Sequence, residues 1–287
     1  MTENRGFYTP AQVLTVGNVV SASVRLYRSH FKDYFLLSLK AWLWILIPVY
    51  GWAKFYALSA LISRLGFGDL VNQPESVHSG ERFVNSRLWQ FLTTLILMFF
   101  IYVGIIVSFF ILGFLLVLIP TAILGGLNIQ NPTNNGTWWV LIFLLVFLLA
   151  IVAIVGSIWL QIRLFLLTLP LAIEENVDAT STIGRSWELT KGHVWRILLI
   201  LFVASLITLP MQILLQEIIS FIVQGILEFT PDNNPLLNSL LLLLFFAMFI
   251  GGSALVLPFW QSLKAVIYYD LRTRREGLGL KLREREI

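Results

Sequence analysis

Few residues in this sequence have types and spacings that could do chemistry. The three histidines, His30, His78 and His193, are far apart, so no single helix carries a pair of them that could bind a metal ion. The chain has no cysteine, which excludes a thiol nucleophile and a thiolate-ligated metal. We therefore expect no catalytic residue, no metal site and no bound cofactor.

Four ionisable residues within or beside apolar stretches are better candidates for function: Lys40, Lys54, Arg163 and Glu174. A charged side chain in a bilayer costs at least about 2.5–3.5 kcal/mol, so such residues indicate either a substrate path or a structural need. For the two lysines, the structural alternative is a long side chain that reaches the membrane surface. For Glu174, it is an ion pair with Arg163 or Arg185.

A second group of ionisable residues is basic and lies next to the apolar stretches. It comprises Arg25, Arg28, Lys32, Arg185, Lys191, Arg272, Arg274 and Arg275. Cations beside membrane segments are typical of proteins that contact anionic lipid headgroups, so we expect membrane lipids as partners. A protein partner or a second copy of the chain is a further possibility. Nucleic acid is not expected, because lipid is the nearer anion for a basic segment that follows a span.

The composition shows what must surround these residues. Hydrophobic residues make up 57% of the chain and charged residues 13%, against about a quarter charged in soluble domains. No charged residue lies between Arg87 and Arg163, between Arg196 and Glu217, or between Asp232 and Lys264. Each of these runs is at least as long as the roughly 20 residues that a helix needs to cross a bilayer. The composition excludes a soluble globule, a disordered chain and a disulfide-stabilised secreted domain.

A bilayer restricts the fold, because only helices and closed barrels pair every peptide group in hydrocarbon. Barrel strands would alternate polar and apolar residues, and residues 240–246 do not. We predict an all-α, polytopic helical membrane protein with about six membrane-embedded helical segments. Amphipathic helices are expected on its cytoplasmic surface.

The chain divides into three parts. Residues 1–33 are predicted to form an amphipathic helix on the membrane surface, because apolar residues recur every three or four positions from Val13 to Phe31. The alternative is a helix packed on the protein itself. Residues 34–270 form the membrane domain, and residues 271–287 a basic cytoplasmic tail. The membrane domain has apolar blocks at 34–63, 88–126, 137–163, 195–216 and 236–263, with amphipathic connections at 74–87 and 178–192.

Lys and Arg in the connections predict the orientation, because cytoplasmic loops are rich in them. The linkers 127–136 and 217–235 have none, so both are expected outside. The connection 163–196 and the segment from residue 264 onward are basic and are expected inside, as is the N-terminal segment. Both termini are therefore predicted to be cytoplasmic, in the inner or plasma membrane of the cell.

Two cytoplasmic termini require an even number of crossings, whereas five apolar blocks are visible. Block 34–63 contains Pro48 and Gly51 and is followed by a basic connection. We therefore predict a broken hairpin that enters the membrane and returns, so that four of the six segments span fully. In the alternative, this block is one tilted span and block 88–126 folds into two.

Three stretches resemble a known family. They lie at residues 16–31, 170–192 and 268–277, and include Arg25, Arg28, Pro170, Glu174, Arg185, Trp187, Lys191, Tyr268, Tyr269, Asp270, Arg272 and Arg275. Together they are similar to the membrane domain attached to some bacterial glycerophosphodiester phosphodiesterases. The resemblance implies a six-segment helical membrane domain. It does not imply phosphodiesterase activity, because in the family that chemistry belongs to a separate soluble barrel with metal-binding carboxylates and histidines, so no enzyme activity is expected.

Judged from their residue types alone, these stretches are typical of elements at a membrane surface. Asp178 is predicted to cap a helix that carries Arg185 and Lys191. Tyr268 and Tyr269 are predicted to lie at the interface. The leading hypothesis is a non-catalytic membrane protein that organises lipids or partner proteins at the cytoplasmic face. The alternative is a transporter or permease for a small or lipid-like substrate, and an intramembrane enzyme ranks third.

Overall fold

We analysed a computed structural model, which describes residues 14–126, 132–228 and 235–277. The described part is helical and contains no strand. The chain divides into two compact units, one formed by Thr93–Arg163 and the other by the rest of the chain. Each unit is described by itself below.

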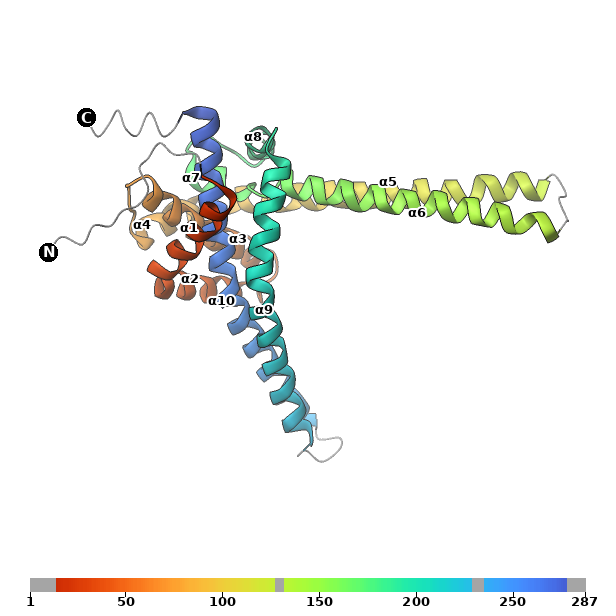
Figure 1. Cartoon of the computed structure of the whole chain (residues 1–287). Coiled ribbons are helices and arrows are strands. Elements are labelled where there is room, and N and C mark those ends of the chain that lie inside the picture. The colour runs from red at the N-terminus through yellow and green to blue at the C-terminus, as the bar shows by residue number, and fades with distance from the viewer. Residues whose placement is uncertain (1–13, 127–131, 229–234, 278–287) are drawn as a thin grey trace. The chain divides into compact units, whose positions relative to one another are not determined.

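The larger unit begins with two short helices that follow each other closely. Helix α1 spans Val16–Ser29 and α2 spans Phe31–Trp44 (Figure 1). The hydroxyl of Thr15 accepts a hydrogen bond from the Asn18 amide at 3.3 Å and so caps the start of α1. The residues Val19, Val20, Ala22, Ser23 and Leu26 form the buried face of α1, which packs mainly on α10 and α9. The apolar side of α1 is therefore buried within the protein. Its location on a membrane surface remains a prediction.

Block 34–63 is broken into two helices, as its Pro48 requires. Helix α3 spans Tyr50–Leu70 and packs against α2. Pro48 has no amide hydrogen to continue a helix, and Val49 has a φ of 64°, which reverses the chain. Gly51 then lies so close to α2 that a Cβ atom there would be 1.9 Å from the Trp44 carbonyl oxygen. Helix α3 continues beyond the apolar block to Leu70, and α4 follows at Val77–Ser86.

Helices α7, α8, α9 and α10 complete the larger unit. Their bounds are Thr168–Ile173, Ser181–Thr190, Val194–Glu228 and Pro235–Glu276. Helices α9 and α10 run side by side (Figure 1). The core lies around the second half of α10, where Ala254, Leu263, Ala265, Val266 and Tyr268 are fully buried. Small residues on α3, such as Ala57 and Ala60, let its backbone approach this core closely.

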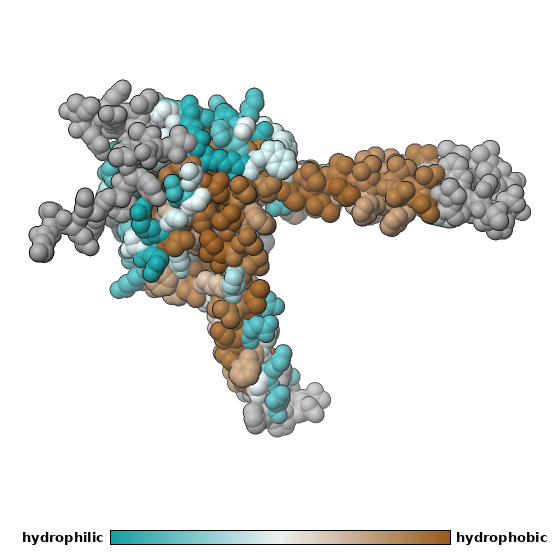
Figure 2. Space-filling model, viewed as in Figure 1, coloured by the Kyte–Doolittle hydropathy of each residue, from teal (hydrophilic) through white to brown (hydrophobic). Residues whose placement is uncertain are grey.

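The smaller unit is a long apolar hairpin. It contains most of α5, which spans Leu88–Gly126, and all of α6, which spans Pro132–Arg163. The two helices lie side by side (Figure 1), and a Cβ atom at Gly113 of α5 would be 3.6 Å from a methyl group of Leu149 on α6. Apolar side chains cover its described surface (Figure 2). Such a surface requires hydrocarbon as its surroundings, because it would be unfavourable in water.

Four helical stretches of the described chain are long and apolar enough to cross a membrane: Leu88–Ile119, Trp139–Ile173, Val194–Ile226 and Asn238–Glu276. The predicted all-α fold is confirmed for the described residues, and these four stretches match the four predicted full spans. The predicted total of about six membrane-embedded segments is not confirmed, because neither α2 nor α3 belongs to this set.

Candidate functional site

Five side chains from three elements meet around Glu174, the residue that ends α7. We call them the Glu174 network: Glu174, Arg185, Tyr268, Arg272 and Glu276. The Nε atom of Arg185, on α8, donates to both carboxylate oxygens of Glu174 at 3.1 and 3.2 Å, and its Nη2 atom donates to Glu276. The Tyr268 hydroxyl also donates to Glu174. The network therefore ties α7 and α8 to the end of α10.

The two arginines of the Glu174 network are fully engaged within the protein. Arg272 donates to Glu276 at 2.7 Å and lies over the rings of Tyr268 and Phe67 at 5.6 and 5.9 Å. Burial alone would lower the pKa of the Arg185 guanidinium, but the hydrogen bonds and charges of Glu174 and Glu276 raise it above its usual range. Charge is balanced here between two carboxylates and two guanidinium groups, all of them partly buried.

A second network surrounds Asp270, which is 3% exposed. We call Asp270, Arg196, Arg274 and the backbone of Leu14 the Asp270 network. The carboxylate accepts from Arg196 and Arg274, each at 3.0 Å, and from the Leu14 amide at 3.1 Å. Both arginines also donate to the Leu14 carbonyl. The first described residue is thereby fixed to the start of α9 and the last turns of α10.

Two further arginines donate hydrogen bonds to backbone carbonyl groups around the end of α7. The Nη1 atom of Arg87 donates to the carbonyl oxygens of Leu171 and Glu174 at 3.2 and 2.7 Å. Arg64 donates to the Ala172 carbonyl at 2.6 Å and forms a 2.6 Å ion pair with Glu75. Cations at a helix C-terminus pair with carbonyls that have no partner in the helix.

The structure separates the predicted basic residues into two sets. Arg185, Arg272 and Arg274 belong to the two networks and pair with carboxylates of the chain. Arg25, Arg28, Lys32, Lys191 and Arg275 are exposed, and Arg275 donates to the Lys191 carbonyl. The first set has its charge paired within the chain, and contact of either set with lipid stays a prediction.

The predicted intramembrane residues do not converge on one site. Lys40 forms a 2.6 Å ion pair with Glu81. Lys54 is 9% exposed and donates to the Asn85 side chain at 2.8 Å. Both lysines therefore bind α4, and neither lines the cavity between α9 and α10 that is described below. Arg163, in the other unit, lies over the ring of Trp159 at 5.1 Å.

The sequence left two partners open for Glu174, and the structure shows an ion pair with Arg185. The roles of Tyr268, Asp270 and Glu276 were missed. Tyr268 and Tyr269 were expected at the interface, but both side chains are buried in the protein. Asp178 accepts from the amides of Thr180 and Ser181 just before α8, and these hydrogen bonds lower its pKa to about 2.

Chemically, both networks are suited to holding helices together. Their carboxylates accept hydrogen bonds from arginines of neighbouring elements, as Glu174 does from Arg185 and Asp270 from Arg196. Among the residues that the structure describes, no group of three His, Asp or Glu side chains is placed to hold a metal ion.

The described chain has four apolar helical stretches of spanning length, and ion pairs link α7, α8, α9 and α10 within the larger unit. These features define a helical integral membrane protein. Residues 129–276 match the family model of the membrane domain of glycerophosphoryl diester phosphodiesterase, and the chain belongs to this family. The predicted resemblance is confirmed, and the match includes every side chain of both networks. No curated protein matches the chain. No solved structure matches it either.

Proposed function

We propose that this chain is a non-catalytic protein of the cytoplasmic membrane that organises lipid in the cytoplasmic leaflet, with both termini on the cytoplasmic side. One observation carries the proposal. The turn between α2 and α3, residues 43–52, presents a cluster of exposed apolar side chains, and we call it the α2–α3 tip. Its exposed residues are Leu43, Leu46, Ile47, Val49, Tyr50 and Trp52, and Leu46 is 63% exposed.

The backbone of the α2–α3 tip is suited to hydrocarbon. The amides of Ile45, Ile47 and Tyr50 donate to carbonyls within the tip or the end of α2, at 2.8 to 3.2 Å. Pro48 has no amide hydrogen that needs a partner. A turn with these groups paired can enter lipid, whereas an open turn would lose several kcal/mol for each unpaired group.

Charges limit how far the α2–α3 tip can enter. Lys40 and Lys54 lie about one turn before and after it, and both bind polar side chains of α4. The arrangement supports insertion of the tip into one leaflet, with the lysines and α4 at the surface. Each large apolar side chain that leaves water contributes about 1.5–3 kcal/mol. The exposed cations Arg28, Lys32, Lys191 and Arg275 would then bind anionic headgroups.

Depth measurements test the insertion of the tip. Because the chain has no cysteine, Ile47→Cys creates a single site for an environment-sensitive fluorophore. In vesicles we expect blue-shifted emission that brominated phosphatidylcholine quenches. The same fluorophore at Asp33→Cys, which is exposed on α2 and is not one of the proposed headgroup ligands, is the matched control and should report water. Equal emission from both positions would contradict the insertion.

Lipid retention tests the role of the exposed cations. A variant with Arg28, Lys32, Lys191 and Arg275 all replaced by Gln should retain several-fold less phosphatidylglycerol on purification, measured by mass spectrometry. In the control, each Arg is replaced by Lys and each Lys by Arg, which keeps the charge. Retention equal to the wild type in the Gln variant would exclude the headgroup contact.

For the transporter alternative, the structure weakens one argument and supplies another. The Pro-broken block with Lys40 and Lys54 motivated this alternative, but both lysines bind side chains of α4. The cavity between α9 and α10 is the observation in its favour. Substrate uptake into proteoliposomes would distinguish transport from a lipid-organising role.

A further inference from the structure

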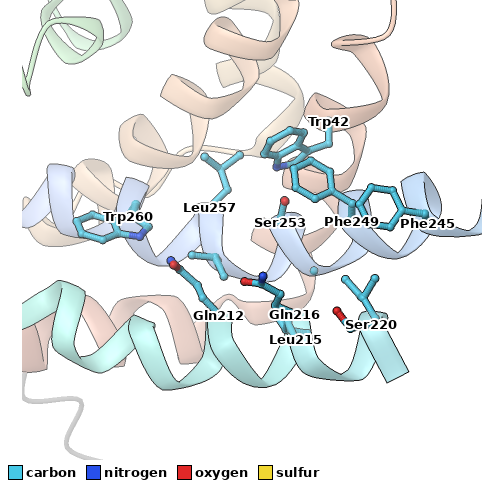
Figure 3. A pocket seen from close by; sticks show the side chains of 13 residues that line it. Trp42, Gln212, Leu215, Gln216, Ser220, Phe245, Phe249, Ser253, Leu257 and Trp260 are labelled. Atoms are coloured by element: carbon cyan, nitrogen blue, oxygen red, sulfur yellow. The ribbon is translucent and has the colours of Figure 1, made fainter. Parts of the chain in front are cut away.

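A cavity of about 650 Å³ lies between α9 and α10, beside Trp42 of α2. Its volume is within the roughly 300–1,000 Å³ that is usual for small-molecule sites. Both helices are candidate spans, so the cavity lies in the part of the chain that meets lipid. Figure 3 shows the side chains of Gln212 and Gln216 extending from α9 towards α10.

The sequence explains why α9 and α10 leave space here. Pro210 of α9 and Pro258 of α10 lie inside their helices near the cavity, where each removes a backbone hydrogen bond and favours a bend. Gly252 contributes no side chain to fill the space, and Leu215 of α9 lies opposite it.

The walls of the cavity are apolar, and its polar groups are uncharged. Leu215, Ile219, Phe245, Phe249, Val256 and Leu257 supply the apolar surface. Gln212 and Gln216, one turn apart on α9, supply two amides, and Ser220 and Ser253 supply hydroxyls. None of the described side chains that line the cavity is charged.

One donor at the cavity lacks a partner. The Nε1 atom of Trp42 is buried and forms no hydrogen bond within the described part of the chain. The indole ring itself is held in place, because it makes edge contacts with Phe55 and Phe249 at centroid distances of 5.2 and 5.8 Å. A buried N–H without an acceptor costs about 1–3 kcal/mol, which the packing of the ring beside the cavity must offset.

From these observations we propose that the cavity binds an uncharged amphiphilic lipid. Its hydroxyl or ester headgroup would bind the amides of Gln212 and Gln216, and its acyl chain would lie against Phe245 and Phe249. An ionised headgroup would find no opposite charge among the lining residues. A helix from a second copy is the less fitting occupant, because residues of three helices make the site concave rather than flat.

Photolabelling tests the proposal. The probe is a monoacylglycerol with a diazirine in its acyl chain, added to the full chain in phosphatidylcholine nanodiscs. We expect saturable labelling of peptides that contain residues 212–220 or 245–260. Unlabelled monooleoylglycerol should compete, and lysophosphatidylglycerol, which is anionic, should not.

Two variants and one control make the labelling specific. The double variant Gln212→Leu/Gln216→Leu keeps the helix apolar but removes both amides, and should reduce labelling about five-fold. Ser253→Phe should reduce it by filling the cavity. Gln224→Leu makes the same change at an exposed position of α9 outside the cavity and should label like the wild type.

Several results would overturn the proposal. Labelling that does not saturate, or that is equal in all four proteins, would show only general contact with lipid. Equal competition by lysophosphatidylglycerol would exclude selection for an uncharged headgroup. Efficient disulfide formation between copies of a Gln216→Cys variant in membranes would identify a second copy as the occupant. The competition arm uses the wild type alone, so it decides the matter even if a variant fails to fold.

Discussion

The hairpin of α5 and α6 and the bundle around α10 satisfy their polar side chains in different ways. In the hairpin, Ser108, Thr121 and Ser157 each donate to a carbonyl four residues earlier in the same helix, at 2.7 to 2.9 Å. The bundle has such local bonds too, for example from Thr208 to the Ala204 carbonyl. In addition, Ser63 donates to Gln261 and Tyr27 to the Leu255 carbonyl, about two hundred residues away. The stability of the hairpin therefore depends on its surroundings, whereas the stability of the bundle depends on its own long-range contacts.

The largest effect should come from breaking a buried network of the bundle. Asp270→Asn keeps the shape of the side chain but leaves Arg196 and Arg274 without their carboxylate, which should cost about 3–5 kcal/mol of unfolding free energy. Denaturant unfolding in detergent micelles measures this loss. Asp33→Asn, at an exposed position, is the control, and equal stability of the two variants would show that the network does not hold the bundle.

In the hairpin, charged substitutions on the apolar surface should have the largest effect. Phe110 is 76% exposed on α5, so Phe110→Lys should cost about 2.5–3.5 kcal/mol of membrane insertion. Phe110→Leu should have little effect. The measurement is the fraction of chain recovered in the membrane after expression, and full recovery of the Lys variant would mean that this surface does not face hydrocarbon.

Glycine substitutions sharpen the contrast between close packing and open surface. Gly51→Ala places a Cβ atom 1.9 Å from the Trp44 carbonyl and should cost about 1–3 kcal/mol, because the backbone must move. Gly104→Ala in the hairpin meets nothing within 4 Å and should cost nothing. Thermal unfolding of both variants compares them directly, and equal midpoints would contradict the tight turn.

The smallest effect is a pH dependence at α4. Burial would raise the pKa values of Glu75 and Glu81, but the hydrogen bonds from Arg64 and Lys40 lower both below the ordinary 4.5. A lowered folded-state pKa stabilises the fold at pH values above 4.5, and this contribution is lost as the pH falls through the folded-state pKa. Lower protection factors in α4, which are exchange rates corrected for the intrinsic pH dependence of amide exchange, are expected below pH 4.5.

The control for this prediction is Glu75→Gln/Glu81→Gln, in which that additional exchange should disappear. Both pairs are partly exposed, so their contribution should not exceed about 1 kcal/mol. Protection factors in α4 that do not change with pH in the wild type would contradict the role of these pairs.

Local features of the fold could be predicted from the sequence, and long-range ones could not. The break at Pro48 and the apolar helices follow from residue types within one segment. The end of α3 could not be placed from hydropathy, because the helix continues past the apolar block to Leu70 and its Arg64 pairs with Glu75 beyond that end. The pairing of Glu174 with Arg185 could be predicted because only 11 residues separate them in the sequence. The pairing of Glu174 with Tyr268 could not, because 94 residues separate them.

The cavity illustrates the same limit. Pro210, Gln212 and Gln216 are visible in the sequence, but nothing there shows that Gly252 and Trp42 lie opposite them. The sequence also grouped Arg272 with the cations expected to bind lipid. The structure places it against Glu276 instead, because one helical turn brings the two together.

Accessibility of single cysteines in cells tests the central claim that the long helices cross the membrane. Cysteines are introduced at Asn134, Lys191 and Phe110, and a membrane-impermeant maleimide is added to intact and then to permeabilised cells. We predict labelling of Asn134→Cys in intact cells, of Lys191→Cys only after permeabilisation, and of Phe110→Cys in neither. Labelling of Asn134→Cys and Lys191→Cys from the same side, or of Phe110→Cys in intact cells, would contradict it.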